Sequence, residues 1–264
     1  MKDAFSGSSA LKASFSAFTM WNVRTPRGAP RNAGSMASPL DNPTWAALTG
    51  PHAHFAERHG QALRYPVDVA PFLALPDDHT PAVWDDVAAL AGPGETVVIS
   101  ATSAAPPADW EVLDRISGVQ LVDAGIPAAE EPEAVRLGPA DVPEMLDLVA
   151  RTQPGPFRKR TVELGTYLGI RRCGRLVAMA GERLHLPGWT EISAVCTDPG
   201  YRGEGLATRL VLAVAAGIRA RGETPFLHAA ATNTPAIRLY LALGFELRRE
   251  PQFVSVRVPL DAAA

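Results

Sequence analysis

The second half of the chain shows clear hydrophobic periodicity. Apolar residues at helical spacing predict helices over residues 140–150, 206–221 and 235–243, and a further helix is expected to lead from the Pro-rich loop 154–157 to residue 164. Short apolar or alternating runs predict strands over 135–137, 167–172, 176–184, 190–197, 225–231 and 253–258. These elements follow the order strand, two helices, three strands, helix, strand, helix, strand. This order predicts an α/β fold in which helices flank a sheet.

The first half also alternates helical and extended patterns, but less regularly. Helices are predicted over 43–48, 52–59, 81–91 and 109–116, and strands over 96–100 and 119–122. This half contains no glycine-rich loop and no cluster of reactive side chains. Residues 127–132 are rich in Pro, Ala and Glu and form the best linker candidate. We therefore expect three parts: a flexible leader or extended start over 1–35, a supporting α/β domain over 36–130, and a second domain over 131–264.

Residues 1–35 differ in composition from the rest of the chain. They hold five basic residues and one acidic residue among many Ser, Ala and Gly. Such a composition is typical of a transit peptide, but composition alone is weak evidence for targeting. The interpretation we favour is an extended start, because Met36 begins a new segment directly after Gly34-Ser35.

Composition excludes several classes of protein. The 264 residues carry a formal net charge of −3, so no basic face for nucleic acid is expected. No apolar run approaches the roughly 18 residues of a membrane helix, and two cysteines, Cys173 and Cys196, are too few for a disulfide framework or a zinc site. We expect a cytoplasmic protein that uses no metal and has neither nucleic acid nor a membrane as a partner.

A glycine loop between a strand and a helix carries the strongest chemical signal. The predicted strand ends at Thr197, a turn through Asp198-Pro199-Gly200 follows, and Arg202-Gly203-Glu204-Gly205 opens the long helix. Backbone N–H groups at a helix start bind anions, and glycines let phosphate oxygens approach the backbone. The loop lacks the Gly-Lys-Ser/Thr ending of a nucleotide P-loop and the third glycine of the dinucleotide fingerprint. It therefore predicts a pyrophosphate site of another kind, with a tight turn that binds nothing as the alternative.

Two motifs in this part of the chain resemble those of a known family. Arg202-x-x-Gly205-x-Ala207 is similar to the Arg/Gln-x-x-Gly-x-Gly/Ala signature of the GNAT acetyltransferase superfamily. About 26 residues further on, Asn233 is followed by Leu239-Tyr240 and Gly244-Phe245, as in that family. The resemblance covers roughly residues 133–260 and is closest to glycine N-acyltransferase-like C-terminal domains. It implies the GNAT fold, whose mixed, mostly antiparallel sheet splays between strands 190–197 and 225–231, and it leaves open that the first half is a degenerate copy of this fold.

The resemblance also implies which residues hold the acyl donor, acetyl-CoA. In such enzymes the pantetheine arm pairs with the strand before the loop, and the pyrophosphate meets the backbone at the start of the helix. Asn233 would bond the arm or hold the next strand apart, with N-capping of its helix as the alternative. The implied donor-binding residues are Val195, Cys196, Thr197, Arg202, Gly203, Glu204, Gly205, Leu206, Ala207, Thr208 and Asn233.

Candidate catalytic residues lie near this loop. By resemblance Tyr240 would be the general acid that donates to the coenzyme thiolate, with core packing as the alternative. Glu191 is the predicted base, acting directly or through water, and its alternative is an exposed carboxylate at a strand end. His228 and Glu182 are weaker candidates for the base. A covalent route through Cys196 is not expected, because a thiol buried in an apolar strand is usually inert.

The sequence therefore predicts an acyl-CoA-dependent N-acyltransferase. It would move the acetyl group of acetyl-CoA to a primary amine by direct attack in a ternary complex. The acceptor is expected to be a small-molecule amine or an amino acid, with residues 154–160 at the rim of its pocket. Two alternatives stay open: transfer of a longer acyl group to an amino acid, and a non-catalytic coenzyme A-binding module.

Overall fold

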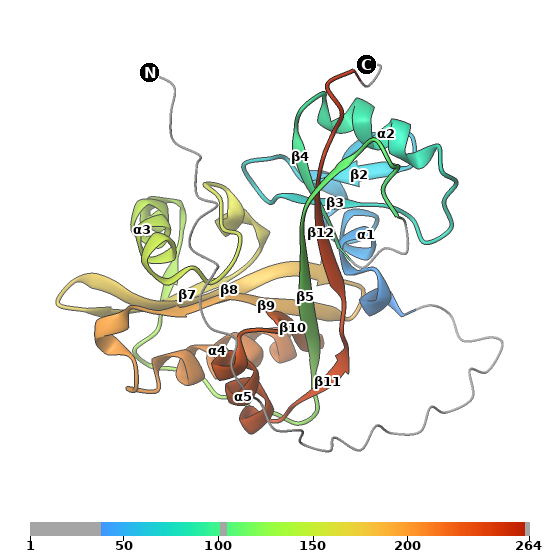
Figure 1. Cartoon of the computed structure of the whole chain (residues 1–264). Coiled ribbons are helices and arrows are strands. Elements are labelled where there is room, and N and C mark those ends of the chain that lie inside the picture. The colour runs from blue at the N-terminus through green and yellow to red at the C-terminus, as the bar shows by residue number, and fades with distance from the viewer. Residues whose placement is uncertain (1–37, 101–104, 262–264) are drawn as a thin grey trace, which may run out of the picture. The chain divides into compact units, whose positions relative to one another are not determined.

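The computed structural model describes residues 38–100 and 105–261, which belong to one compact unit that runs from residue 37 to 264 (Figure 1). The predicted leader over 1–35 lies outside the described residues. The predicted boundary near residue 130 lies inside this unit. That the parts on either side of this boundary fold independently stays a prediction. That the first half is a degenerate copy of the fold of the second half also stays a prediction.

A single sheet runs through the described residues. Its 12 strands lie in the order β1-β2-β3-β4-β12-β5-β10-β9-β8-β7-β6, and β11 also pairs with β5. Only two of the described pairs, β3 with β4 and β9 with β10, are parallel. The strands are β1 Glu57–His59, β2 Ala62–Arg64, β3 Phe72–Ala74, β4 Thr96–Ser100, β5 Glu111–Asp123, β6 Val135–Leu137, β7 Tyr167–Arg172, β8 Arg175–Leu186, β9 Trp189–Thr197, β10 Thr224–Ala230, β11 Phe245–Arg249 and β12 Gln252–Arg257.

The predicted splay of the sheet is confirmed between β9 and β10. Their parallel register runs from Thr224 opposite Trp189 to Leu227 opposite Ile192, and it stops there. Both strands continue beyond this point, to Thr197 and Ala230. The ends of the two strands therefore separate, which leaves the backbone on the facing edges without a strand partner.

Helices cover both faces of the central sheet (Figure 1). On one face α4 packs through Leu210, Val214 and Ile218 against apolar residues of β7 to β10, and α5 joins the same core. On the other face α3 packs through Met145 and Leu148 against β7 to β9. The helices are α1 Pro43–Leu48, α2 Val83–Ala91, α3 Val142–Thr152, α4 Leu206–Ala220 and α5 Thr234–Leu243.

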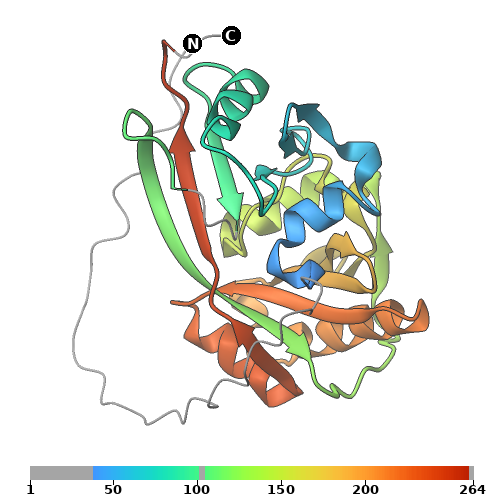
Figure 2. The same ribbon diagram turned by 90° about the vertical axis from the view of Figure 1, so that its right-hand side faces the viewer.

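The first half of the chain continues the sheet. β5 pairs along its first part with β12 and along its second part with β10, so it connects the two halves of the sequence. Figure 2 shows β5 and β12 side by side as a long ribbon that leaves the central sheet. Val256 of β12 joins a core with α2 and β4, which also contains Trp84 and Val97.

The structure contradicts three of the predicted helices. Residues 109–116, predicted as a helix, lie mostly in strand β5, because pairing with β12 about 140 residues away overrides their local helical spacing. Residues 52–59 form a 3₁₀ turn, Ala53–Phe55, and then β1. The helix expected up to residue 164 is a single 3₁₀ turn, Thr161–Leu164. The short strands β1, β2, β3 and β11 were not predicted.

Candidate active site

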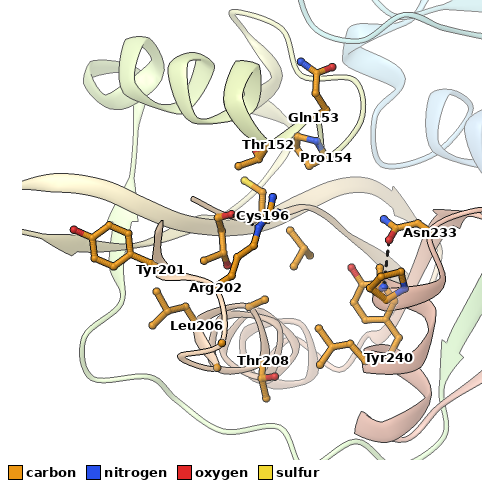
Figure 3. A pocket seen from close by; sticks show the side chains of 18 residues that line it. Thr152, Gln153, Pro154, Cys196, Tyr201, Arg202, Leu206, Thr208, Asn233 and Tyr240 are labelled. Atoms are coloured by element: carbon orange, nitrogen blue, oxygen red, sulfur yellow. Dashed lines mark hydrogen bonds between the residues drawn. The ribbon is translucent and has the colours of Figure 1, made fainter. Parts of the chain in front are cut away.

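A cleft opens where β9 and β10 separate. It has a volume of about 660 Å³ and lies between the end of β9, the start of α4 and one face of α5 (Figure 3). Ten of the eleven residues predicted to hold the acyl donor line it, and Glu204 does not. Tyr240 lines it as well. The structure thus brings together residues from two motifs that are separated in sequence.

The start of α4 is open to this cleft. Gly205 precedes the helix in a left-handed conformation, with φ of 73°, and no side chain caps the N–H groups of the first turn. Gly203 has φ of 89°, and a Cβ added at either glycine would meet nothing within 4 Å. Other residues rarely adopt such φ values. The loop therefore presents uncapped backbone donors, at the positive end of a helix of 15 residues, to a cavity large enough for an extended anionic ligand.

A β-bulge shapes the edge of β9 beside the cleft. Cys196 pairs with Met179 and Ser193 pairs with Gly181, so Ala194 and Val195 together lie opposite the single residue between those two on β8. Ala194 has φ of 53°, as the extra residue of a bulge often requires an unusual backbone conformation. The bulge takes Ala194 and Val195 out of the regular ladder beside the cleft, which Val195 lines.

Comparisons with known proteins support this description. The family model described as FR47-like protein matches residues 167–254, from β7 into β12. A solved GNAT-family protein from Novosphingobium aromaticivorans DSM 12444 is 39% identical; the match covers 83% of this chain and 98% of that chain, with a TM-score of 0.77. The chain belongs to the GNAT family of acetyltransferases. A GCN5-related N-acetyltransferase from Kribbella flavida, 18% identical over 82% of this chain and 94% of that chain, has the same fold with a TM-score of 0.55. No curated protein matches the chain.

Tyr240 of this GNAT protein faces the cleft from α5 (Figure 3). Burial, with a smaller contribution from Cys196, raises the pKa of its phenol to about 12. The hydroxyl is therefore protonated throughout the neutral range and can donate a hydrogen bond into the cleft. The ring also packs against Phe245, with centroids 6.0 Å apart, so packing and donation are compatible.

Cys196 is buried as expected for an unreactive thiol, and Asn233 makes the helix cap that was its alternative role. Burial raises the pKa of the Cys196 thiol to about 11, which keeps it protonated and unreactive at neutral pH. Asn233 caps α5, because its Oδ1 accepts from the backbone N–H of Ala236 at 3.3 Å. Asn233 also lines the cleft, so capping fixes its side chain at the cleft wall.

Glu191 does not have the environment of a base. Its side chain is fully buried, and its two oxygens accept from Arg183 at 2.6 and 2.7 Å. Burial alone would raise the pKa of this carboxyl, but the charge and hydrogen bonds of Arg183, together with the hydrogen bond from His228, hold it below its ordinary value. The base role predicted for Glu191 is therefore not supported, since a buried, paired carboxylate has little tendency to take up a proton.

The side chains of the two weaker candidates for the base, His228 and Glu182, also have hydrogen-bond partners. Nδ1 of His228 lies 2.7 Å from Glu191, and its Nε2 lies 3.1 Å from the amide nitrogen of Gln120. Arg248 donates to the amide oxygen of Gln120, which fixes that amide with its nitrogen toward His228. Nδ1 then carries the proton and Nε2 accepts from Gln120. Glu182 is buried, accepts from Arg221, and lines neither this cleft nor the cavity beside it.

A second cavity of about 320 Å³ joins the cleft at the bulge. Val195, Asn233 and Tyr240 line both the cleft and the second cavity, so the two adjoin at these residues. Of the residues 154–160 predicted to form the rim of the acceptor pocket, Pro154 to Pro156 border the second cavity, whereas Arg158 and Lys159 line a different depression. Its far wall comes from the first half of the chain, through Phe72, Val98 and Ile116, and no sequence motif marks these residues.

In the described parts of the chain, no helix is long and apolar enough to cross a membrane.

Proposed function

We propose that this GNAT protein transfers the acetyl group of acetyl-CoA to the primary amine of a small molecule or amino acid, by direct attack in a ternary complex. One observation carries the proposal. Two separate cavities meet at the bulge of β9, where Tyr240 and Val195 border both. A donor in the larger cleft and an acceptor in the smaller cavity would have their reactive ends at this junction, which is what direct transfer requires.

The residues around the cleft suit the donor. The uncapped N–H groups after Gly205 suit a pyrophosphate, and the freed edge of β9 at Val195 to Thr197 suits an amide-containing arm that pairs like an added strand. When bound, acetyl-CoA supplies an acyl group activated as a thioester. Backbone N–H groups at the bulge, where the regular ladder is interrupted, are proposed to stabilise negative charge on the acyl oxygen.

Tyr240 is proposed to assist the leaving sulfur. Its phenol, with a pKa of about 12, stays protonated and donates to the sulfur as negative charge develops there. The sulfur takes one proton by way of Tyr240, which regains a proton from water. The amine gives up one proton to water, because neither Glu191 nor His228 offers an open position to receive it.

The environment of Cys196 supports direct transfer over a covalent acyl-cysteine. The thiol is protonated at neutral pH and its side chain is buried. A two-step route would need a thiolate and a partner base beside it. Among the described residues no histidine lines the cleft with Cys196.

Free-thiol release tests the proposed function. Purified protein is incubated with acetyl-CoA, with and without a mixture of primary amines, and the thiol is measured with a colorimetric reagent. We expect release that depends on both the protein and an amine, and an acetylated product by mass spectrometry. Saturable binding of acetyl-CoA without amine-dependent release would instead favour a non-catalytic coenzyme A-binding module. A higher rate with a longer acyl-CoA would favour the alternative donor.

A further inference from the structure

The acceptor cavity has a composition that selects among amines. Most of its wall is apolar, and the first half of the chain provides Phe72 from β3, Val98 from β4 and Ile116 from β5. Phe253 lies on β12, between β4 and β5, and pairs directly opposite Ile116 of β5. These side chains, Phe72, Val98, Ile116 and Phe253, form an apolar wall of the same cavity that Tyr240 lines.

No carboxylate lines this cavity among the described residues. Its charged group is Arg183, whose guanidinium lies 5.0 Å from the ring centroid of Phe72 and is paired with the buried Glu191. His228 is held between Glu191 and Gln120. Among the described residues, no side chain that lines the cavity therefore offers a free negative charge to a second ammonium group, because the charge of Arg183 is already compensated by Glu191.

The same surroundings act on the amine that reacts. An ammonium ion moved from water to an apolar site loses hydration, so its neutral form is favoured and its pKa falls. An amine that packs against the apolar wall therefore has a lowered pKa and is more often neutral when it reaches the junction. This matters because, among the described residues that line the two cavities, His228 is held by Glu191 and Gln120 and no carboxylate is present.

From these observations we infer the class of acceptor: a monoamine whose amino group is attached to an apolar body of about the size of an aromatic ring. The inference rests on the proposed function and deepens it. It also gives the first half of the chain a role, since this half builds the wall that selects the acceptor. Diamines and short polar amines would be poor acceptors, because they offer a second charge or leave the apolar wall in contact with water.

Two matched pairs of amines test the inference with the full-length protein. Phenylalanine amide and glycine amide both react through an α-amine, but only the first carries an aromatic side chain. We expect kcat/KM to be at least about tenfold higher for phenylalanine amide. Butylamine and 1,4-diaminobutane differ in the second amino group, and we expect the monoamine to be preferred. Equal rates within each pair, or a preference for glycine amide or the diamine, would overturn the inference and leave the proposed function intact. Transfer to none of the four by protein that binds acetyl-CoA would overturn both.

A pair of variants tests the wall itself. Ile116 is 44% exposed and lines the cavity, whereas Leu113, on the same strand and 38% exposed, does not. Both positions tolerate a polar side chain, since neither belongs to a buried core cluster. Ile116→Asp should lower kcat/KM for phenylalanine amide and shift the preference toward 1,4-diaminobutane by about tenfold, and Leu113→Asp should change neither. Acetyl-CoA binding should be the same in both variants. An Ile116→Asp variant with unaltered preference would contradict the assignment of this wall to the acceptor.

Discussion

Arg183 of β8 and Glu191 of β9 form a two-point ion pair inside the sheet, with nitrogen–oxygen distances of 2.6 and 2.7 Å. Glu191 has no exposed surface, and its remaining partner is Nδ1 of His228. The ion pair fixes the orientation of Arg183, which lines the second cavity. A carboxylate held in this way suits a structural role better than proton transfer.

Removing the charge of Glu191 should be costly. In Glu191→Gln the guanidinium of Arg183 stays buried without an ionic partner, and we expect the free energy of unfolding to fall by about 3–5 kcal/mol. Urea denaturation measures this change. The partly exposed pair of Glu57 and Arg64 offers a control: Glu57→Gln should cost less than about 1 kcal/mol. Equally small losses in the two variants would show that the buried pair is not a structural element.

Substitution of Cys196 should leave transfer intact. The thiol is buried and protonated at neutral pH, with its pKa raised to about 11, so the proposed route does not use it. We expect Cys196→Ala to keep kcat within about threefold of the unmodified protein, as a small change of packing allows. A fall in kcat by several orders of magnitude, with acetyl-CoA binding preserved, would favour an acyl-cysteine route.

Tyr240→Phe should separate turnover from binding. It removes the hydroxyl that faces the junction and keeps the ring that packs on Phe245. We expect kcat to fall by about 100-fold while the dissociation constant of acetyl-CoA changes little. Tyr201→Phe is a matched control, because Tyr201 lines the same cleft without a proposed role. If both variants turn over at the normal rate, Tyr240 is a packing residue only.

His52 makes stability depend on pH. Burial, with smaller contributions from the nearby His185 and His54, lowers its pKa from 6.5 to about 3, and its Nδ1 lies 2.8 Å from the hydroxyl of Tyr65. The unfolded chain binds a proton at this residue below about pH 6.5 while the folded chain does not, so stability falls as the pH drops from 6.5 toward 3. In His52→Gln this contribution is absent, and the free energy of unfolding should fall less between pH 7 and 5 than in the unmodified protein. Parallel pH profiles for the two proteins would contradict the assignment.

The residues of the cleft proposed to hold the donor could be predicted from the sequence because they lie in local elements. The glycine loop, the start of α4 and the cap at Asn233 each depend on a few neighbouring residues, and the structure places them as expected. The acceptor cavity could not be predicted, because Phe72 and Ile116 reach it through strand pairings distant in sequence. The burial of Glu191 could not be predicted for a similar reason: its partner Arg183 lies across a hairpin on the neighbouring strand. The bulge at Ala194 also interrupts the regular alternation expected along strand 190–197.

Calorimetry of acetyl-CoA binding tests the central claim most directly. Gly205→Asp and Gly205→Asn introduce side chains of equal size at a left-handed position that both residues tolerate, and they differ by one negative charge. We expect saturable binding by the unmodified protein, a modest loss in Gly205→Asn, and a further loss of at least about tenfold in Gly205→Asp, because its carboxylate would lie against the pyrophosphate. Equal affinities in the two folded variants, or no binding by the folded unmodified protein, would contradict the assignment of this cleft to the acyl donor.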